Sequence, residues 1–273
     1  MPERLISQFS DSDIHFLLET VNPGLVSKIS TIKGDPQIIE RMLDQESGKL
    51  FQRIMFKSGD EVSAMISPRF LFEILLRRAY VELKSQRFTI ERTASQKIPV
   101  FDVREVVQLL ADKKILKYLA DMLSSFTRTE SFTMPVRVRR GVWRKIRFSD
   151  MDIDSLLRLC EVADEEHRFG LYKRIADLSL FILGIFPEHV IRDFNYTMEP
   201  HSFRRWHRSE ADYEELGRRF YKLAGEHQDA RLLDLSAVFH ELQDKFTIAK
   251  KPLNYISGNF IQINKEKLFP TPP

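Results

Sequence analysis

The chain has 273 residues, 30% of them charged and 43% hydrophobic, a balance that excludes a largely disordered protein and allows a sizeable core. Its 42 basic and 39 acidic side chains leave a formal charge of +3, which excludes strong global attraction to nucleic acid or anionic lipid, so only local clusters can act in that way. The single cysteine, Cys160, excludes an intrachain disulfide and a multi-cysteine metal site, and its place on a helical stripe favours burial.

The first half of the chain, residues 1 to 130, is predicted to be helical. Its first residues carry acidic side chains and lack the apolar stretch of a secretory signal, so we expect a cytoplasmic protein. Asp35 follows Gly34 and precedes Pro36, an arrangement typical of the N-cap of a helix, here one that runs through Leu43.

A second helix is predicted to begin at Ser67, because a hydroxyl N-cap followed by Pro68 at the first helical position is a strong start signal. This helix should extend to about Lys84. Two ion pairs with partners four residues apart are expected on its outer faces: Glu73 with Arg77, and Arg78 with Glu82.

Residues 88 to 99 are expected to form a loop or a short strand, after which Asp102 is placed to cap a further helix. A polar break at residues 112 to 114 precedes apolar side chains at helical spacing from Ile115 to Phe126. Two stacked helices or one kinked helix would satisfy this pattern.

In residues 131 to 148 the spacing of apolar side chains changes from helical to alternating. Apolar and polar side chains alternate on both sides of the turn signal Arg140-Gly141. We predict a basic β-hairpin. Arginine forks can grip phosphate or carboxylate groups and tryptophan can stack on an exposed base, although a solvated hairpin that pairs with nearby carboxylates would explain the same pattern. The candidate binding residues are Arg137, Arg139, Arg140, Trp143, Arg144, Lys145 and Arg147.

The second helical half, residues 149 to 258, is predicted to surround a central helix that ends at Pro187. This helix is apolar on all sides from Leu178 to Phe186, far short of the ~20 residues of a membrane span, so we expect burial and no membrane insertion. Pro252 is expected to close the regular structure, and residues 259 to 273 to form an extended tail.

Two further groups of residues are candidates for binding. A second basic-aromatic cluster, formed by Arg204, Arg205 and Trp206, could hold an anion or a partner, although the pattern favours a loop anchored in the core by the tryptophan. Arg174 and Asp177 enter the central helix where it becomes apolar. Buried charges are normally paired, so they should fix the packing of the helices, and together with Tyr172 they are also the candidates for a ligand pocket.

No catalytic, cofactor or metal site is predicted. The nearest glycines, Gly217 and Gly225, are too far apart for phosphate-binding loops or a nucleophile elbow. The acidic stretch from Asp150 to Asp154 with Glu161 resembles a calcium loop but lacks the required glycine, and a helix start explains it. Residues 164 to 167 combine carboxylates with a histidine and are interpreted as a solvated turn.

Residues 170 to 250 resemble an uncharacterised group of bacterial helical proteins. The likeness rests on the segment from Tyr172 to Glu188 and on a later one from Tyr213 to Tyr221. It implies a bacterial helical protein and no particular activity.

The sequence therefore predicts a mainly α-helical domain with one basic hairpin between two helical halves. We expect an interaction or regulatory protein that binds a macromolecular partner, most simply a protein, through its basic-aromatic surface. Nucleic-acid binding by the hairpin, and a small-ligand or enzymatic pocket near Arg174 and Asp177, are the alternatives. Either an internal helix pair or a homo-oligomer would satisfy the helical stripes near the carboxyl end.

Overall fold

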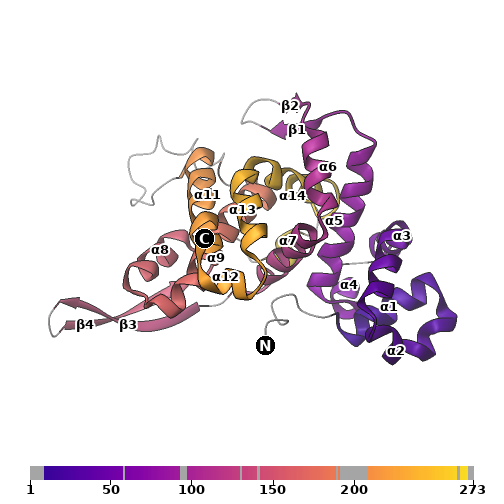
Figure 1. The fold of residues 1–273 in the computed structure, drawn as a ribbon, viewed down its shortest axis with the longest axis horizontal. Helices are drawn as coiled ribbons and strands as arrows, with labels where there is room; N and C mark the ends of the chain where they lie inside the picture. Colours follow the sequence, from indigo (N-terminus) through magenta and orange to yellow (C-terminus); the bar gives the residue numbers. More distant parts are fainter. Residues whose placement is uncertain are drawn as a thin grey trace.

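The computed structural model describes residues 9–57, 59–92, 97–129, 131–139, 142–188, 190, 208–262 and 265–269. Helices dominate this part of the chain, and its strands form two separate antiparallel pairs, so the predicted mainly α fold is confirmed. Figure 1 shows the helices as one continuous body from which both strand pairs stand out.

A group of helices, the longest of 20 residues, lies at one side of the molecule. They are α1 (Asp11–Val21), a 3₁₀ helix (Pro23–Lys28), α2 (Ile29–Lys33), α3 (Pro36–Met55) and α4 (Gly59–Met65). The Asp35 carboxylate accepts hydrogen bonds from the backbone N–H groups of Gln37 and Ile38, which confirms the predicted cap. Buried Asp13 on α1 accepts hydrogen bonds from both the backbone and the hydroxyl of Ser67, which attaches α1 to the next long helix.

That next helix, α5 (Pro68–Lys84), begins with the predicted Ser67 cap, because the Ser67 hydroxyl accepts from the Phe70 N–H group. The expectation that both of its ion pairs lie on outer faces is wrong for one of them. Glu73 and Arg77 are buried, since α3 and α7 cover this face of α5. Arg77 reaches Glu73 at 2.6 Å, and also pairs with carboxylates on α3.

The first strand pair, β1 (Thr89–Arg92) and β2 (Lys97–Val100), leads into α6 (Val103–Ala111) and α7 (Lys113–Ser125). Asp102 occupies the N-cap position of α6, but its side chain makes no capping hydrogen bond. Its carboxylate instead accepts from the Thr89 hydroxyl at 2.5 Å and pairs with Lys251. Residues distant in the sequence therefore bind the Asp102 oxygen atoms that the local pattern predicts as acceptors for the first N–H groups of α6.

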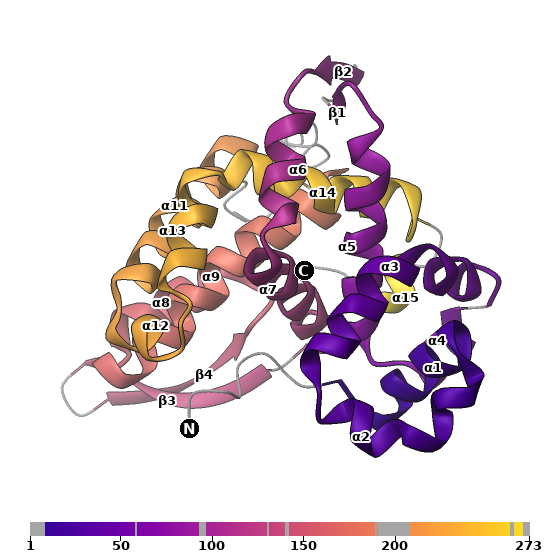
Figure 2. The ribbon, with the colours of Figure 1, turned by 45° about the vertical axis from the view of Figure 1, so that its right-hand side comes forward.

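The longer hairpin consists of β3 (Ser131–Arg139) and β4 (Val142–Ser149), paired antiparallel with a register shift between Arg137 and Arg139. It extends from the helical body beside α8 (Ile153–Val162), as both views show (Figures 1 and 2). The predicted hairpin is thus present among the described residues.

Helix α9 (Glu165–Ile185) is the central element, as predicted, and its apolar second half is buried. It contacts α8, α11 (Glu210–Glu226) and α14 (Phe246–Asn259), while two shorter helices, α12 (Gln228–Leu232) and α13 (Ser236–Asp244), connect the last two. Phe126 at the end of α7 stacks on Phe181 of α9 with ring centroids 4.2 Å apart, which joins the two halves of the chain.

The carboxyl-terminal region differs from the sequence prediction. Pro252 lies inside α14, so it does not close the regular structure. Burial of Phe246, Leu253 and Ile256 on the same helix outweighs the local cost of the proline. Residues 265 to 268 form the short helix α15 (Lys265–Leu268), and Phe269 is buried, so this part of the expected extended tail is folded onto the core.

Gly184 of α9 and Gly217 of α11 allow α14 to approach these two helices closely, since an added Cβ would meet Leu253 or Phe246. A Cβ at Gly217 would lie 2.2 Å from Cε2 of Phe246, so Gly217→Ala should lower the free energy of unfolding by about 1–3 kcal/mol. Gly170→Ala is the matched control, because nothing lies within 4 Å of its added Cβ, and it should be neutral or stabilise by up to about 1 kcal/mol. Urea unfolding of both variants measures the difference, and equal effects would contradict the packing argument.

Candidate functional site

The β3–β4 hairpin carries most of the sequence-predicted binding residues. Its register places Arg137 opposite Trp143, Pro135 opposite Lys145 and Thr133 opposite Arg147. Positions that face each other across an antiparallel pair belong to the same side of the sheet, so these three pairs share one side. The opposite side carries the Phe132–Phe148 and Met134–Ile146 pairs.

The two sides of the hairpin differ in environment where the structure describes the side chains. Lys145 is exposed, whereas Phe148, near the root of the hairpin, is 1% exposed. One side is therefore anchored at Phe148, and the other carries the exposed Lys145. Arg144 pairs with Val136, so its position belongs to the same side as Phe148, and Arg139 pairs with Val142 beyond the register shift.

Arg174, a candidate pocket residue, is attached to the root of this hairpin. Its guanidinium pairs with the Asp150 carboxylate at 2.6 Å, immediately after β4, and donates to the Ser125 hydroxyl at 2.8 Å. It also lies over the Phe126 ring, 3.8 Å from the centroid. One side chain thus connects α9, the end of α7 and the end of β4, so the hairpin has a fixed base.

The candidates Arg140, Arg204, Arg205 and Trp206 lie outside the described residues. The chain is described again from Arg208, whose guanidinium pairs with Asp154 of α8 at 2.5 Å. Because α8 contacts β4, residue 208 enters the described structure close to the root of the hairpin.

Asp177 forms the second candidate centre, deep in the helical body. Its side chain has no solvent exposure, and its Oδ1 accepts hydrogen bonds from the Tyr118 hydroxyl at 2.6 Å and the Tyr221 hydroxyl at 2.8 Å. Lys173, one turn earlier on α9, donates to Oδ2 at 2.6 Å. Tyr172 packs on Phe220, with ring centroids 5.7 Å apart.

Both carboxylate oxygens of Asp177 are thus bonded to the protein itself, and Arg174 is bonded to Asp150 and Ser125. No pattern in the sequence marks Tyr118 of α7 and Tyr221 of α11 as partners of Asp177. Lys173 could have been identified as a partner from the sequence, because it precedes Asp177 by four residues on the same helix. What the arrangement does chemically is to neutralise a buried charge and join three helices.

The calcium-like stretch is fully engaged in other interactions. Asp152 caps α8 through the backbone N–H groups of Asp154 and Ser155, while Asp150 and Asp154 pair with Arg174 and Arg208. Asp152 therefore has the helix-start role that the sequence indicates, whereas Asp150 and Asp154 bind arginines.

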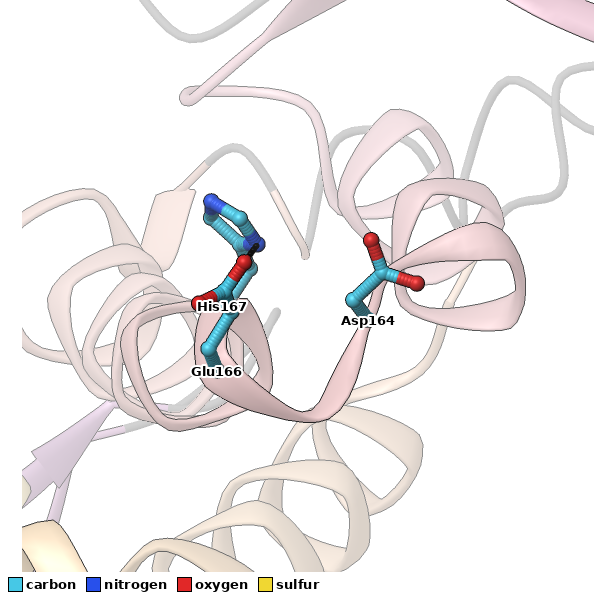
Figure 3. Close-up of side chains that lie close together, drawn as sticks. All are labelled: Asp164, Glu166 and His167. Atoms are coloured by element: carbon cyan, nitrogen blue, oxygen red, sulfur yellow. Dashed lines mark ion pairs between the residues drawn. The ribbon is translucent and has the colours of Figure 1, made fainter.

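Asp164, Glu166 and His167 come close enough for their ligand atoms to lie within 4.8 Å of one another (Figure 3). All three are exposed, and the one ion pair among them joins Glu166 to His167 at 3.8 Å. An exposed acidic cluster of this kind is common without a metal. The solvent exposure agrees with the sequence prediction, but the predicted turn is wrong for Glu166 and His167, which lie in the first turn of α9 after the N-cap residue Asp164.

A small pocket and a half-buried cysteine are two further features of the described residues. A half-open pocket of about 80 Å³ lies between the end of α3, α5 and the segment after α14, and is lined by apolar side chains with Lys57. Burial raises the pKa of the half-buried Cys160 to about 11, so its nucleophilic thiolate is scarce at neutral pH.

Comparisons of the chain with protein-family models, with curated proteins and with solved structures gave no match. The functional argument therefore depends on the residues themselves.

The Asp177 centre predicts a dependence of stability on alkaline pH. Burial first, and the Asp177 charge second, raise the pKa of Tyr118 and Tyr221 well above the ordinary value of 10.0. Above that value the unfolded chain loses these protons while the folded chain keeps them, so the free energy of unfolding falls as the pH rises. The contribution is fully present at lower pH.

Tyr221→Phe should make this alkaline fall shallower by up to about 1.4 kcal/mol per pH unit. Urea unfolding between pH 8 and pH 11 measures the slope of the free energy of unfolding against pH. The slopes of variant and wild type are compared, and not the free energies, because the lost hydrogen bond lowers stability at every pH. Tyr118→Phe should behave in the same way. Parallel curves for wild type and both variants would refute the assignment.

Proposed function

We propose that this protein binds an acidic surface of a partner protein on its β3–β4 hairpin. The observation that carries the proposal is geometric. A strand pair rich in arginine and lysine extends from a helical body to which its root is attached by Phe148 and Arg174 (Figures 1 and 2).

The fixed root supports binding because it reduces the entropy lost when the hairpin engages a partner. The ladder sets the spacing of the basic positions, and the exposed Lys145 lies on the side opposite to the anchored Phe148. Complementary charge of this kind speeds encounter and selects acidic surfaces, and its effect falls with ionic strength.

Nucleic acid is the second candidate partner. The register pair Arg137 and Trp143 favours it, because an arginine position beside a tryptophan position can combine phosphate contact with base stacking. We do not propose a ligand pocket at Arg174 and Asp177, since both side chains are occupied by partners within the protein.

The test compares a hairpin variant with a control of equal charge. In the first, Arg137, Arg139, Arg144 and Arg147 are replaced by glutamate. In the control, four exposed basic residues on the helices are replaced in the same way: Lys28, Arg41, Lys49 and Lys222. Fluorescence anisotropy measures binding of a labelled glutamate-rich peptide and of labelled single- and double-stranded DNA and RNA at several salt concentrations.

We expect the hairpin variant to lose affinity for the peptide by about tenfold or more at low salt, while the control changes about threefold or less. Tighter, salt-dependent binding of DNA or RNA that requires the hairpin would replace the first candidate by the second. Binding of neither probe by the wild type, or equal losses in the two variants, would overturn the proposal.

A further inference from the structure

The shorter hairpin, β1–β2, presents an apolar face to solvent. Phe101 is 82% exposed, Ile90 53% and Phe88 40%. The register pairs Ile90 with the exposed Pro99, and the rings of Phe88 and Phe101, one step beyond the ladder, lie 6.2 Å apart. These four residues form what we call the β1–β2 apolar face. Large side chains exposed together in this way mark interaction sites.

Two positions on the opposite side of the same hairpin are fixed to the protein, while Ile98 on that side is 41% exposed. Thr89 is buried and its hydroxyl donates to Asp102, while Glu91 pairs with Lys251 of α14 at 2.7 Å. Lys251 also pairs with Asp102 and is itself buried. The apolar face is therefore held outward by contacts on its reverse side.

The charges that flank the apolar face are mainly basic. Lys84 and Arg87 precede Phe88, and Arg104 follows Phe101 by three residues. All three are exposed, and none has an ion pair within the described part of the chain. The nearby acids Glu91 and Asp102 are paired with Lys251, which leaves the exposed Glu105.

The hairpin forms an outer end of the molecule, beyond α5 and α6, in both views of the ribbon (Figures 1 and 2). An exposed apolar face with basic neighbours matches the chemistry of an anionic bilayer surface, where apolar side chains enter the headgroup region and cations contact lipid phosphates. No helix of the described residues has the length and hydropathy to cross a bilayer, so such a contact is peripheral.

We infer that the β1–β2 apolar face docks on anionic membrane surfaces. A second copy of the chain fits less well, because it would bring the basic residues of two copies together. A patch of four side chains also falls below the ~800 Å² per partner of a stable dimer.

Vesicle sedimentation tests the inference. Wild type is mixed with vesicles of phosphatidylcholine alone, or with 30 mol % phosphatidylglycerol, at two salt concentrations. We expect binding to the anionic vesicles that weakens with salt. The double variant I90S/F101S should partition about tenfold less onto them, and K84Q/R87Q more than about tenfold less, since each basic residue near the surface contributes about fivefold.

Two controls separate this face from other surfaces. Leu232 is 69% exposed on α12, so L232S removes a comparable apolar side chain elsewhere and should leave vesicle binding unchanged. K145E/R147E alters the β3–β4 hairpin, and in this background the F101S substitution should still reduce vesicle binding. The substituted side chains of the β1–β2 apolar face are exposed, and thermal unfolding of each variant verifies that it folds.

A gain-of-signal measurement complements these losses. Relative to the wild type, whose tryptophans are Trp143 and Trp206, F101W should show added quenching by brominated phosphatidylcholine mixed into the anionic vesicles, whereas L232W should not. Absence of wild-type binding to anionic vesicles would overturn the inference, as would equal binding by I90S/F101S. Dimerisation in light scattering that requires Phe101, without vesicle binding, would assign the face to a second copy instead.

Discussion

The buried carboxylate of Asp177 is the constraint on which the arrangement of the helices depends. A charge without solvent contact in the middle of α9 is costly unless it is paired and hydrogen-bonded. Tyr118 from α7 and Tyr221 from α11 supply hydroxyls to one oxygen, and Lys173 supplies the opposite charge at the other. The first half of the chain must therefore meet the second half in one register.

A second buried charge cluster fixes the first half in the same way. Arg77 of α5 lies between Glu73 on its own helix and Glu40 and Asp44 on α3, while Arg69 reaches Asp121 of α7 at 2.6 Å. Burial raises the pKa of Glu73 against the opposing effect of the two arginines. Packed apolar side chains provide most of the stabilisation, whereas directional charge contacts select one arrangement of α3, α5 and α7.

The helical body holds in place the two small hairpins that we propose as binding elements. A two-stranded hairpin alone is marginally stable in water. Here β3–β4 is fixed at its root by Phe148 and Arg174, and β1–β2 by Lys251, so each can expose side chains that the helices do not need for folding. The two hairpins differ in chemistry, since the first is basic and the second presents apolar side chains with basic neighbours.

The sequence alone determined the mainly α fold, the Asp35 and Ser67 caps, the buried α9 and the β3–β4 hairpin, because periodicity, capping and turn signals depend on neighbouring residues. It also singled out Arg174 and Asp177 as charges that need partners. Only the tertiary structure identified those partners, placed Pro252 inside α14, buried Glu73 with Arg77 and exposed Phe101. These outcomes depend on side chains far apart in the sequence, and a local pattern contains no information about which of them meet.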